Sequence, residues 1–278
     1  MRTAAKTLLV FTDLDGTLLD AVTYSFDEAR PALRALEKRR IPLIICSSKT
    51  RAEIEPLRRS LRNRHPFISE NGGAVYVPHG TFSFDIPHAV DREGYEVLEL
   101  GVPYAALRAF LSEFQAERPD RVRGFGDMSD EEVARLCGFS VERARLARQR
   151  EFDEPILADD DAALSLLKQK AEASGWRIVS GGRFHHLLGP HDKGLAVRRL
   201  KEMFVRDQGP VRVIGLGDGP NDFPLLRESD IPVLLPAPDG AFEPGIDLPG
   251  LILAPGPGPA GWREAVFHLI GPEASGRD

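Results

Sequence analysis

The sequence predicts an α/β protein in which a doubly wound, Rossmann-like parallel sheet carries an inserted α+β unit. Short apolar segments alternate with segments of helical periodicity at both ends of the chain, a pattern typical of buried parallel strands and their crossover helices. Between these ends, residues 88–189 mix helical patterns with short strand patterns. We therefore expect a core domain formed by residues 1–87 and 190–278 and an inserted domain formed by residues 88–189.

Composition argues against several classes of function. The chain has 278 residues, of which 42% are hydrophobic, enough for a sizeable core and for two domains. A net charge of -6 argues against nucleic-acid and membrane-surface binding, and no apolar run approaches membrane-spanning length. The first residues are too few for a signal peptide and the two cysteines form no disulfide framework, so we expect a cytoplasmic protein. The oligomeric state stays open, and a homodimer is one option.

The first strand pattern ends on two acids. An apolar run at residues 8–11 is followed by Asp13, Asp15 and then Gly16-Thr17. Open α/β sheets bind ligands at the carboxyl ends of their strands, so two carboxylates beside a flexible glycine indicate a site for a cation and a phosphate. Asp-Gly is also a common turn dipeptide, and this fragment alone fits a plain strand and turn equally well.

Helical and strand patterns then alternate along the N-terminal part. Ser25 has Glu28 three residues later, which predicts a capped helix. A turn at residues 70–73 contains two glycines that permit close backbone approach. We expect helices at residues 25–39 and 52–61, strands at 41–46 and 65–69, and a hairpin of 74–77 with 81–86.

The inserted part contains two ambiguous clusters. Asp159-Asp160-Asp161 is interpreted as a helix N-cap with acids favoured by the helix dipole, not as a metal site. His185 and His186 are adjacent in a strand, so at most one of them can face a ligand, and zinc is not favoured. We expect helices at residues 104–117, 129–136, 140–150 and 160–174, and strands at 121–125, 154–157, 176–180 and 183–188.

The chain then returns to the core pattern. Lys193 precedes a helix, and the strand after that helix ends on an acidic, glycine-rich segment at residues 217–222. We expect helices at residues 195–204 and 261–270, and strands at 211–216, 231–235 and 251–253.

Four polar clusters occur in one order along the core pattern. They are Asp13-x-Asp15-Gly16-Thr17, then Ser47, then Lys193, then Gly217-Asp218-x-x-Asn221-Asp222. In type and order they resemble the four motifs of the haloacid dehalogenase superfamily of phosphatases. The insert resembles the cap of the branch that includes sugar-phosphate phosphatases and phosphomannomutase.

Two segments narrow the resemblance. Cys46-Ser-Ser-Lys-Thr-Arg51 and Ile68-Ser-Glu-Asn-Gly-Gly73 are similar to segments of the mannosyl-3-phosphoglycerate phosphatase family. Most of the branch is expected to have Thr-Gly-Arg where this chain has Ser47-Ser48-Lys49, and that departure favours the narrower family.

The catalytic roles follow from the chemistry of phosphate esters and from the resemblance. Hydrolysis needs a nucleophile, a cation on the phosphoryl oxygens, and a proton for the leaving oxygen. The resemblance implies that Asp13 is both nucleophile and Mg²⁺ ligand and forms an aspartyl-phosphate. Asp15 would be the general acid and base, with its backbone carbonyl on the cation. Ser47 would donate to a phosphoryl oxygen, and Lys193 would hold that group and Asp13.

The metal would be held by oxygen atoms. Asp218 would supply the second carboxylate, while Asn221 and Asp222 would orient water ligands and Lys193. Oxygen-only ligands favour Mg²⁺ over zinc. The expected metal site is therefore formed by Asp13, Asp15, Asp218, Asn221 and Asp222.

The expected substrate adds a carboxylate and a sugar to the phosphate. Lys49 and Arg183 are the cations that sequence places best to reach the carboxylate, although Arg183 also fits an ordinary surface arginine. Glu70 and Asn71 would bind hydroxyls. The full set of expected substrate-binding residues is Thr17, Ser48, Lys49, Glu70, Asn71, Arg183 and His185.

Three functions compete at this point. The first is a Mg²⁺-dependent phosphatase of mannosyl-3-phosphoglycerate, or of glucosyl-3-phosphoglycerate or sucrose phosphate. The second is a phosphohexomutase, which needs cap arginines for a second phosphate. The third, a non-catalytic binding protein, is disfavoured because Asp13, Asp15 and Lys193 are all present.

Overall fold

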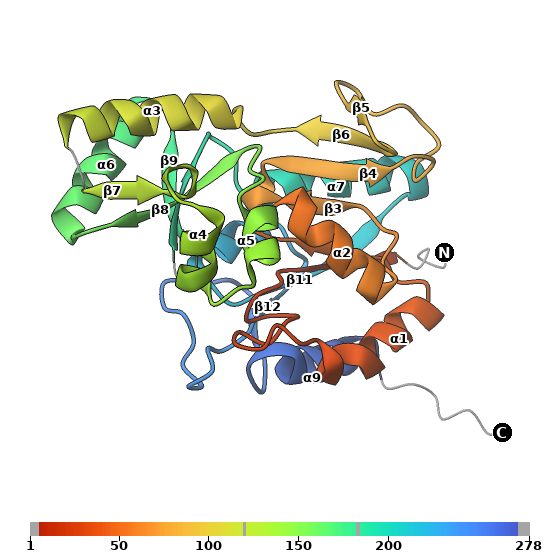
Figure 1. Ribbon diagram of the computed structural model, residues 1–278. Helices are drawn as coiled ribbons and strands as arrows, with labels where there is room; N and C mark the ends of the chain where they lie inside the picture. Colours follow the sequence, from red (N-terminus) through yellow and green to blue (C-terminus); the bar gives the residue numbers. More distant parts are fainter. Residues whose placement is uncertain (1–5, 119–120, 182–183, 272–278) are drawn as a thin grey trace.

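The computed structural model describes residues 6–118, 121–181 and 184–271. In this part of the chain the strands form two sheets, a large one with helices on both faces and a smaller one at its side (Figure 1). No helix of the described residues is both long enough and apolar enough to cross a bilayer.

The large sheet has the predicted parallel core. Its described strands run in the order β13-β12-β11-β1-β2-β3-β4-β6-β5, and neighbours from β13 to β3 are parallel. β4, β6 and β5 add an antiparallel edge. The strands are β1 (Thr7–Thr12), β2 (Leu43–Cys46), β3 (Phe67–Ser69), β4 (Ala74–Pro78), β5 (Val90–Arg92), β6 (Tyr95–Glu99), β11 (Val211–Gly217), β12 (Ile231–Leu234) and β13 (Ile252–Leu253).

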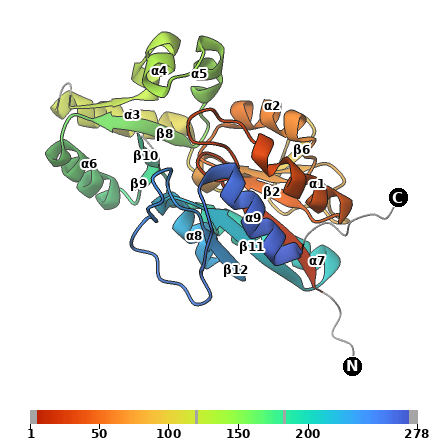
Figure 2. The same ribbon diagram turned by 90° about the horizontal axis from the view of Figure 1, so that it is seen from below.

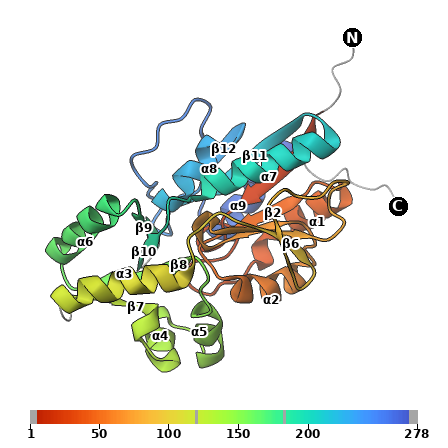
Figure 3. The same cartoon turned by 90° about the horizontal axis from the view of Figure 1, so that it is seen from above.

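Helices cover both faces of this sheet, as the doubly wound pattern predicts. Val10 of β1 packs in one hydrophobic cluster with α1, α2 and α9, whereas its neighbours Leu9 and Phe11 pack with α7 and α8. Figures 2 and 3 show the two faces in turn. The helices are α1 (Arg30–Lys38), α2 (Arg51–Leu61), α7 (Lys193–Gln208), α8 (Phe223–Arg227) and α9 (Gly258–Ile270).

The start of α1 differs from the prediction. A 3-10 turn at Asp27–Ala29 precedes the helix, which begins only at Arg30. The Ser25 hydroxyl accepts a hydrogen bond from the backbone N–H of Asp27 at 3.1 Å, so it closes a local turn instead of capping α1. The expected capping box with Glu28 was therefore wrong.

The predicted hairpin and the predicted edge of the core were also wrong. Residues 81–86 form no strand; Phe82 and Ile86 pack against the α7 side of the sheet. The antiparallel partner of β4 is β6, and β5 pairs with β6. The large sheet therefore continues to Glu99, beyond the boundary predicted between residues 87 and 88, because pairing with β4 decides where these later strands belong.

Residues 104–188 are here called the inserted unit, and the described residues among them form an α+β structure as expected. The small sheet has the order β7-β8-β10-β9, with every neighbouring pair antiparallel. Asp160 caps α6 by accepting from the N–H of Ala163 at 2.7 Å, which confirms the capping interpretation. The elements are α3 (Tyr104–Glu117), β7 (Val122–Gly124), α4 (Asp130–Cys137), α5 (Val141–Ala147), β8 (Asp153–Ala158), α6 (Asp161–Ala173), β9 (Arg177–Gly181) and β10 (Phe184–Leu188).

Candidate active site

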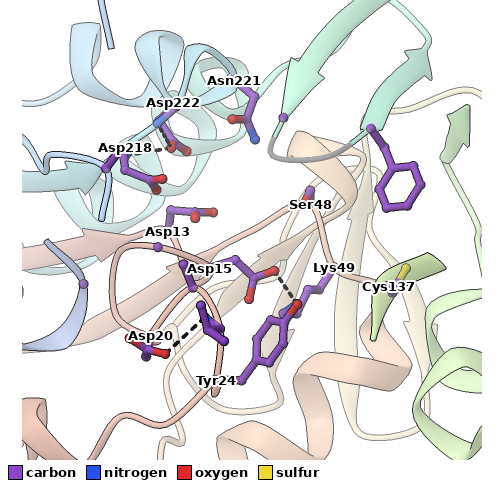
Figure 4. Close-up of a pocket in the computed structure, with 18 of the residues that line it drawn as sticks. Asp13, Asp15, Asp20, Tyr24, Ser48, Lys49, Cys137, Asp218, Asn221 and Asp222 are labelled. Atoms are coloured by element: carbon purple, nitrogen blue, oxygen red, sulfur yellow. Dashed lines mark hydrogen bonds and ion pairs between the residues drawn. The ribbon is translucent and has the colours of Figure 1, made fainter. Parts of the chain in front are cut away.

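A cluster of carboxylates lies where two neighbouring strands end. Asp13 follows β1 and Asp218 follows β11, and because these strands are parallel neighbours their carboxyl ends lie side by side. Asp222 lies at the end of the short 3-10 turn Pro220–Asp222. One carboxylate oxygen from each of the three residues lies within 4.8 Å of the others (Figure 4).

Lys193 is the cation within this cluster. It is the first residue of α7, is fully buried, and its Nζ lies 2.5 Å from Oδ1 of Asp13 and 2.5 Å from Oδ1 of Asp222. Burial alone would lower the pKa of Lys193, but the two carboxylates outweigh it and the pKa lies above its ordinary value. Burial, opposed by Lys193, raises the pKa of Asp13 to about 7.

The cluster fits a hard divalent cation. Three carboxylates face one ammonium group, so negative charge is in excess. Asp218 Oδ1 accepts from the Thr17 hydroxyl at 2.6 Å, which leaves Oδ2 of Asp218 without a donor among the described residues. A Cβ at Gly16 would lie 2.6 Å from that Oδ2, so only glycine leaves this oxygen room. Carboxylate oxygens are the donors that Mg²⁺ prefers.

Asp222 and Thr17 hold Asp218 in position by hydrogen bonds. Asp222 Oδ2 accepts from the backbone N–H groups of Asp218 and Gly219, each at 3.1 Å, and so holds the loop that carries Asp218. Thr17, expected to bind substrate, is fully buried and bound to Asp218. Asn221 lines the cavity described below, and its Nδ2 donates to Oδ1 of Asn71 at 3.0 Å.

Asp15 pairs with a lysine and is not part of the three-carboxylate cluster. Its Oδ2 lies 2.5 Å from Nζ of Lys49, and Glu53 lies 3.9 Å from the same nitrogen. Burial would lower the pKa of Lys49, yet Asp15 and Glu53 raise it above its ordinary value. Lys49 is therefore a charged side chain within reach of the same space as the acid cluster.

A cavity of about 710 Å³ opens over these groups. The core contributes acids and small polar groups, and the labelled side chains in Figure 4 surround the opening. Aromatic rings form much of the opposite wall. Lining residues from the core include Asp13, Asp15, Tyr24, Ser48, Lys49, Asp218 and Asn221, and those from the inserted unit include Phe125, Phe139, Arg150, Phe184 and His186.

Several predicted site residues do not line this cavity: Ser47, which was expected to be catalytic, and Glu70 and Asn71, which were expected to bind substrate. Ser47 is buried, and its hydroxyl accepts from the N–H of Lys49 at 3.3 Å. Glu70 and Asn71 are also buried, and both bind the inserted unit: the Glu70 carboxylate accepts from the N–H of Phe152 at 2.8 Å, and Asn71 donates to Asp153 at 2.8 Å. The Glu70 carboxylate and Nδ2 of Asn71 thus join the core to the inserted unit, while Oδ1 of Asn71 accepts from Asn221 of the core.

The two remaining predictions concern the strand β10. His185 bonds to Ser180 at 3.0 Å and is absent from the described cavity lining, whereas His186 is present. The two histidines face opposite sides of the strand, as predicted, and His186, not His185, lines the described cavity. Arg183 lies outside the described residues.

The side chains that the inserted unit brings to the cavity were not predicted from the sequence. Arg150 donates to the backbone carbonyl of Ser48 at 2.8 Å and lies 3.9 Å from Asp153. Phe125, Phe139 and Phe184 showed only patterns typical of ordinary core residues. Face alternation in the predicted strand at residues 183–188 was the one signal that could have found His186.

Glu70→Gln is expected to change how stability depends on pH. Burial raises the pKa of Glu70 to about 8, although Arg150 and the N–H groups of Phe152 and Glu151 oppose the shift. The folded chain thus favours the protonated carboxyl, so the stability from Glu70 is full below its ordinary pKa of 4.5 and is lost as pH rises towards 8. Glutamine cannot ionise. The free energy of unfolding of the variant should therefore rise relative to that of wild type by up to about 1.4 kcal/mol per pH unit across this window.

Urea unfolding at a series of pH values measures this difference. Subtracting the free energy of unfolding of wild type from that of the variant at each pH removes the contributions of the other acids. Glu113→Gln, at an exposed position of α3, is the control and should show a flat difference. A flat difference for Glu70→Gln as well would contradict the prediction.

Comparison with known proteins agrees with this geometry. Residues 10–87 match the haloacid dehalogenase-like hydrolase family. A glucosyl-3-phosphoglycerate/mannosyl-3-phosphoglycerate phosphatase of Methanococcoides burtonii is 43% identical over 264 residues, which cover 95% of this chain and 97% of that protein. A mannosyl-3-phosphoglycerate phosphatase of Pyrococcus furiosus is 35% identical over 229 residues, which cover 82% of this chain and 90% of that protein.

Solved structures share the fold. A structure from Thermoplasma acidophilum matches with a TM-score of 0.69 at 19% identity and covers 96% of this chain and 99% of its own. The chain is therefore a phosphoric monoester hydrolase that belongs to the haloacid dehalogenase-like hydrolases, in the family of the two phosphatases to which it is similar.

Proposed function

We propose that this enzyme hydrolyses the phosphate ester of mannosyl-3-phosphoglycerate with the help of Mg²⁺, and that it also accepts glucosyl-3-phosphoglycerate. The observation that carries the proposal is the buried Asp13–Lys193–Asp222 cluster beside Asp218, at one end of a cavity large enough for a glycosylated phosphoglycerate. The relative named for both substrates, at 43% identity, supports the wider substrate range.

In the first step the substrate's phosphoryl group passes to Asp13. Lys193 holds Oδ1 of Asp13 at 2.5 Å, which leaves Oδ2 to attack phosphorus. As the new P–O bond forms, the bond from phosphorus to the glycerate oxygen breaks, and Asp15 gives its proton to that oxygen. The products of this step are the free glycosylglycerate and an aspartyl-phosphate on Asp13.

In the second step Asp15 works in reverse. Its carboxylate takes a proton from a water molecule, whose oxygen attacks phosphorus and displaces the carboxylate of Asp13. Inorganic phosphate leaves, and both aspartates return to their starting states. Asp13, Asp218 and Asp222 would hold the Mg²⁺, with the carbonyl of Asp15 and the side chain of Asn221 near it; when bound it supplies positive charge to the phosphoryl oxygens.

Lys49 can pair with either the carboxylate of Asp15 or the carboxylate of the substrate. In the structure Nζ of Lys49 lies 2.5 Å from a carboxylate oxygen of Asp15. When the glycerate carboxylate of the substrate pairs with Lys49 in its place, Asp15 can carry the proton that the first step needs. Arg150, on the inserted unit side of the cavity, is a second cation within the lining.

The inserted unit would serve as a cap that chooses the leaving group. It supplies the aromatic wall of Phe125, Phe139 and Phe184, and aromatic faces suit the apolar side of a sugar ring. It is joined to the core by Arg150 and by the contacts of Glu70. A cap that closes on the substrate would exclude water before the first step.

Phosphate release from a substrate panel tests the proposal. With Mg²⁺ present, the two glycosyl-3-phosphoglycerates should exceed sucrose phosphate and mannose 6-phosphate in kcat/KM by at least about 100-fold, because only they offer the carboxylate. Chelation should abolish activity, and added Mg²⁺ should restore it. Full activity after exhaustive chelation would contradict the metal role, and transfer of phosphate between hexose positions would favour a mutase.

A further inference from the structure

The β10 strand turns one histidine towards the cavity and the other away from it. Phe184 and His186 line the cavity, whereas Leu187 is buried in the hydrophobic cluster of α3 and α6 on the other face of the small sheet. His185 shares that other face and bonds to Ser180. His186 therefore presents a polar ring to a wall that is otherwise rich in aromatic side chains.

Asp153 holds this ring by one nitrogen. Nδ1 of His186 lies 2.9 Å and 3.0 Å from the two carboxylate oxygens of Asp153, which is fully buried. Burial would raise the pKa of Asp153, but His186, Arg150 and Asn71 together lower it, so Asp153 is a carboxylate that can only accept. Nδ1 therefore donates to Asp153, and Nε2 has no hydrogen bond to any residue that the structure describes. In a neutral ring that donates from Nδ1, Nε2 is a hydrogen-bond acceptor.

Asp153 is itself tied to the loop of the acid cluster. Its Oδ2 accepts from Nδ2 of Asn71 at 2.8 Å, and Oδ1 of Asn71 accepts from Nδ2 of Asn221 at 3.0 Å. Asn221 lies in the same turn as Asp222. A chain of buried and partly buried hydrogen bonds thus joins His186 to the turn that carries Asp222.

We propose that His186 is a specificity-determining residue whose Nε2 accepts a hydrogen bond from a hydroxyl of the substrate's sugar, with Asp153 as its positioning residue. The inference rests on the proposed function. Glycerate has hydroxyls only at carbons 2 and 3, and in a glycosyl-3-phosphoglycerate one carries the sugar and the other the phosphate. The sugar is thus the only part of the substrate with hydroxyl donors to offer.

Two variants separate the nitrogen that faces the cavity from the one that binds Asp153. In His186→Asn the amide nitrogen falls near the former Nδ1, so the bond to Asp153 is kept and the cavity-facing group is lost. In His186→Gln the longer side chain places its amide near the former Nε2. His185→Gln, on the opposite face, is the matched comparison. Each is assayed on mannosyl-3-phosphoglycerate, on 3-phosphoglycerate, which lacks the sugar, and on an aryl phosphate.

His186→Asn should raise KM for mannosyl-3-phosphoglycerate about 10-fold and leave 3-phosphoglycerate and the aryl phosphate within about 2-fold of wild type. His186→Gln should recover part of the loss, and His185→Gln should match wild type on all three. In Asp153→Asn, ¹⁵N spectra of the His186 ring should show a mixture of tautomers in place of one, together with the raised KM. Thermal unfolding reports whether each variant is folded.

An equal loss on all three substrates would overturn the proposal, because it would mean a structural role. A loss shared by mannosyl-3-phosphoglycerate and 3-phosphoglycerate, but not the aryl phosphate, would also overturn it and assign His186 to the carboxylate. Failure of the proposed function is a separate result, seen in wild type as turnover of a different sugar phosphate. In that case the same variants are assayed with that sugar phosphate, and an unchanged KM there overturns the role of His186.

Discussion

Asp13→Asn is expected to lower kcat by roughly 10⁴-fold or more while the chain stays folded, because an amide oxygen is a poor nucleophile. The amide is nearly isosteric and can still accept from Lys193. It also removes one of three crowded carboxylates, and burial already raises the pKa of Asp13 to about 7. The midpoint of thermal unfolding without metal should therefore equal or exceed that of wild type.

Phosphate release and thermal unfolding together test this expectation. Asp207→Asn is the matched control: this aspartate is half-buried near the end of α7, the helix of Lys193, and its partners are Ser83 and Gln208. The control should keep wild-type activity. Retention of a tenth of the wild-type rate by Asp13→Asn would remove Asp13 from the nucleophile role.

Lys193→Met is expected to damage both activity and stability. Methionine matches the length of the lysine stem but leaves Asp13 and Asp222 buried without the cation that lies 2.5 Å from each. Removing one partner of a buried ion pair costs about 3–5 kcal/mol in the free energy of unfolding. Loss of the charge beside the reacting phosphoryl group should lower kcat by about 100-fold or more.

Lys201→Met provides the comparison within the same helix. Lys201 pairs with Asp230 in a partly exposed position, so this variant should lose less than about 1 kcal/mol. Combining Lys193→Met with Asp13→Asn should recover part of the lost stability, since it neutralises one of the stranded carboxylates. Urea unfolding measures all three. A Lys193→Met variant as stable as the Lys201→Met variant would contradict the role given to this buried cation.

The acid cluster could be predicted because each of its strand-end acids can be recognised from the few residues that precede it in the chain. Asp13 and Asp218 each follow an apolar strand directly, and the carboxyl ends of parallel strands meet at one edge of a sheet. Lys193 was found by its order in the chain, and the resemblance implied its contact with Asp13; that Lys193 is itself the first residue of α7 was not predicted. The family resemblance then followed from order and residue type together.

The cavity wall could not be predicted in the same way. Glu70 and Asn71 lie in a glycine-rich turn at a strand end, which made them candidates for ligand binding, yet both are used to hold the inserted unit. His186 and Arg150 were not selected, because a histidine in a strand and an arginine after a helix are common in any sequence. Whether such a side chain faces the cavity depends on how the inserted unit packs against the core.

We could predict from the sequence the parallel sheet and the acids at its edge, because each strand and each motif is formed by residues close together in the chain. The class of reaction followed from the resemblance that the motifs carry together. The tertiary structure alone decided that β5 and β6 extend the large sheet, that Lys49 pairs with Asp15, and that His186, not His185, lines the cavity. These features depend on contacts between segments far apart in the chain. Hydrophobic periodicity shows which face of a helix or strand is buried. It does not show which distant segment packs against that face.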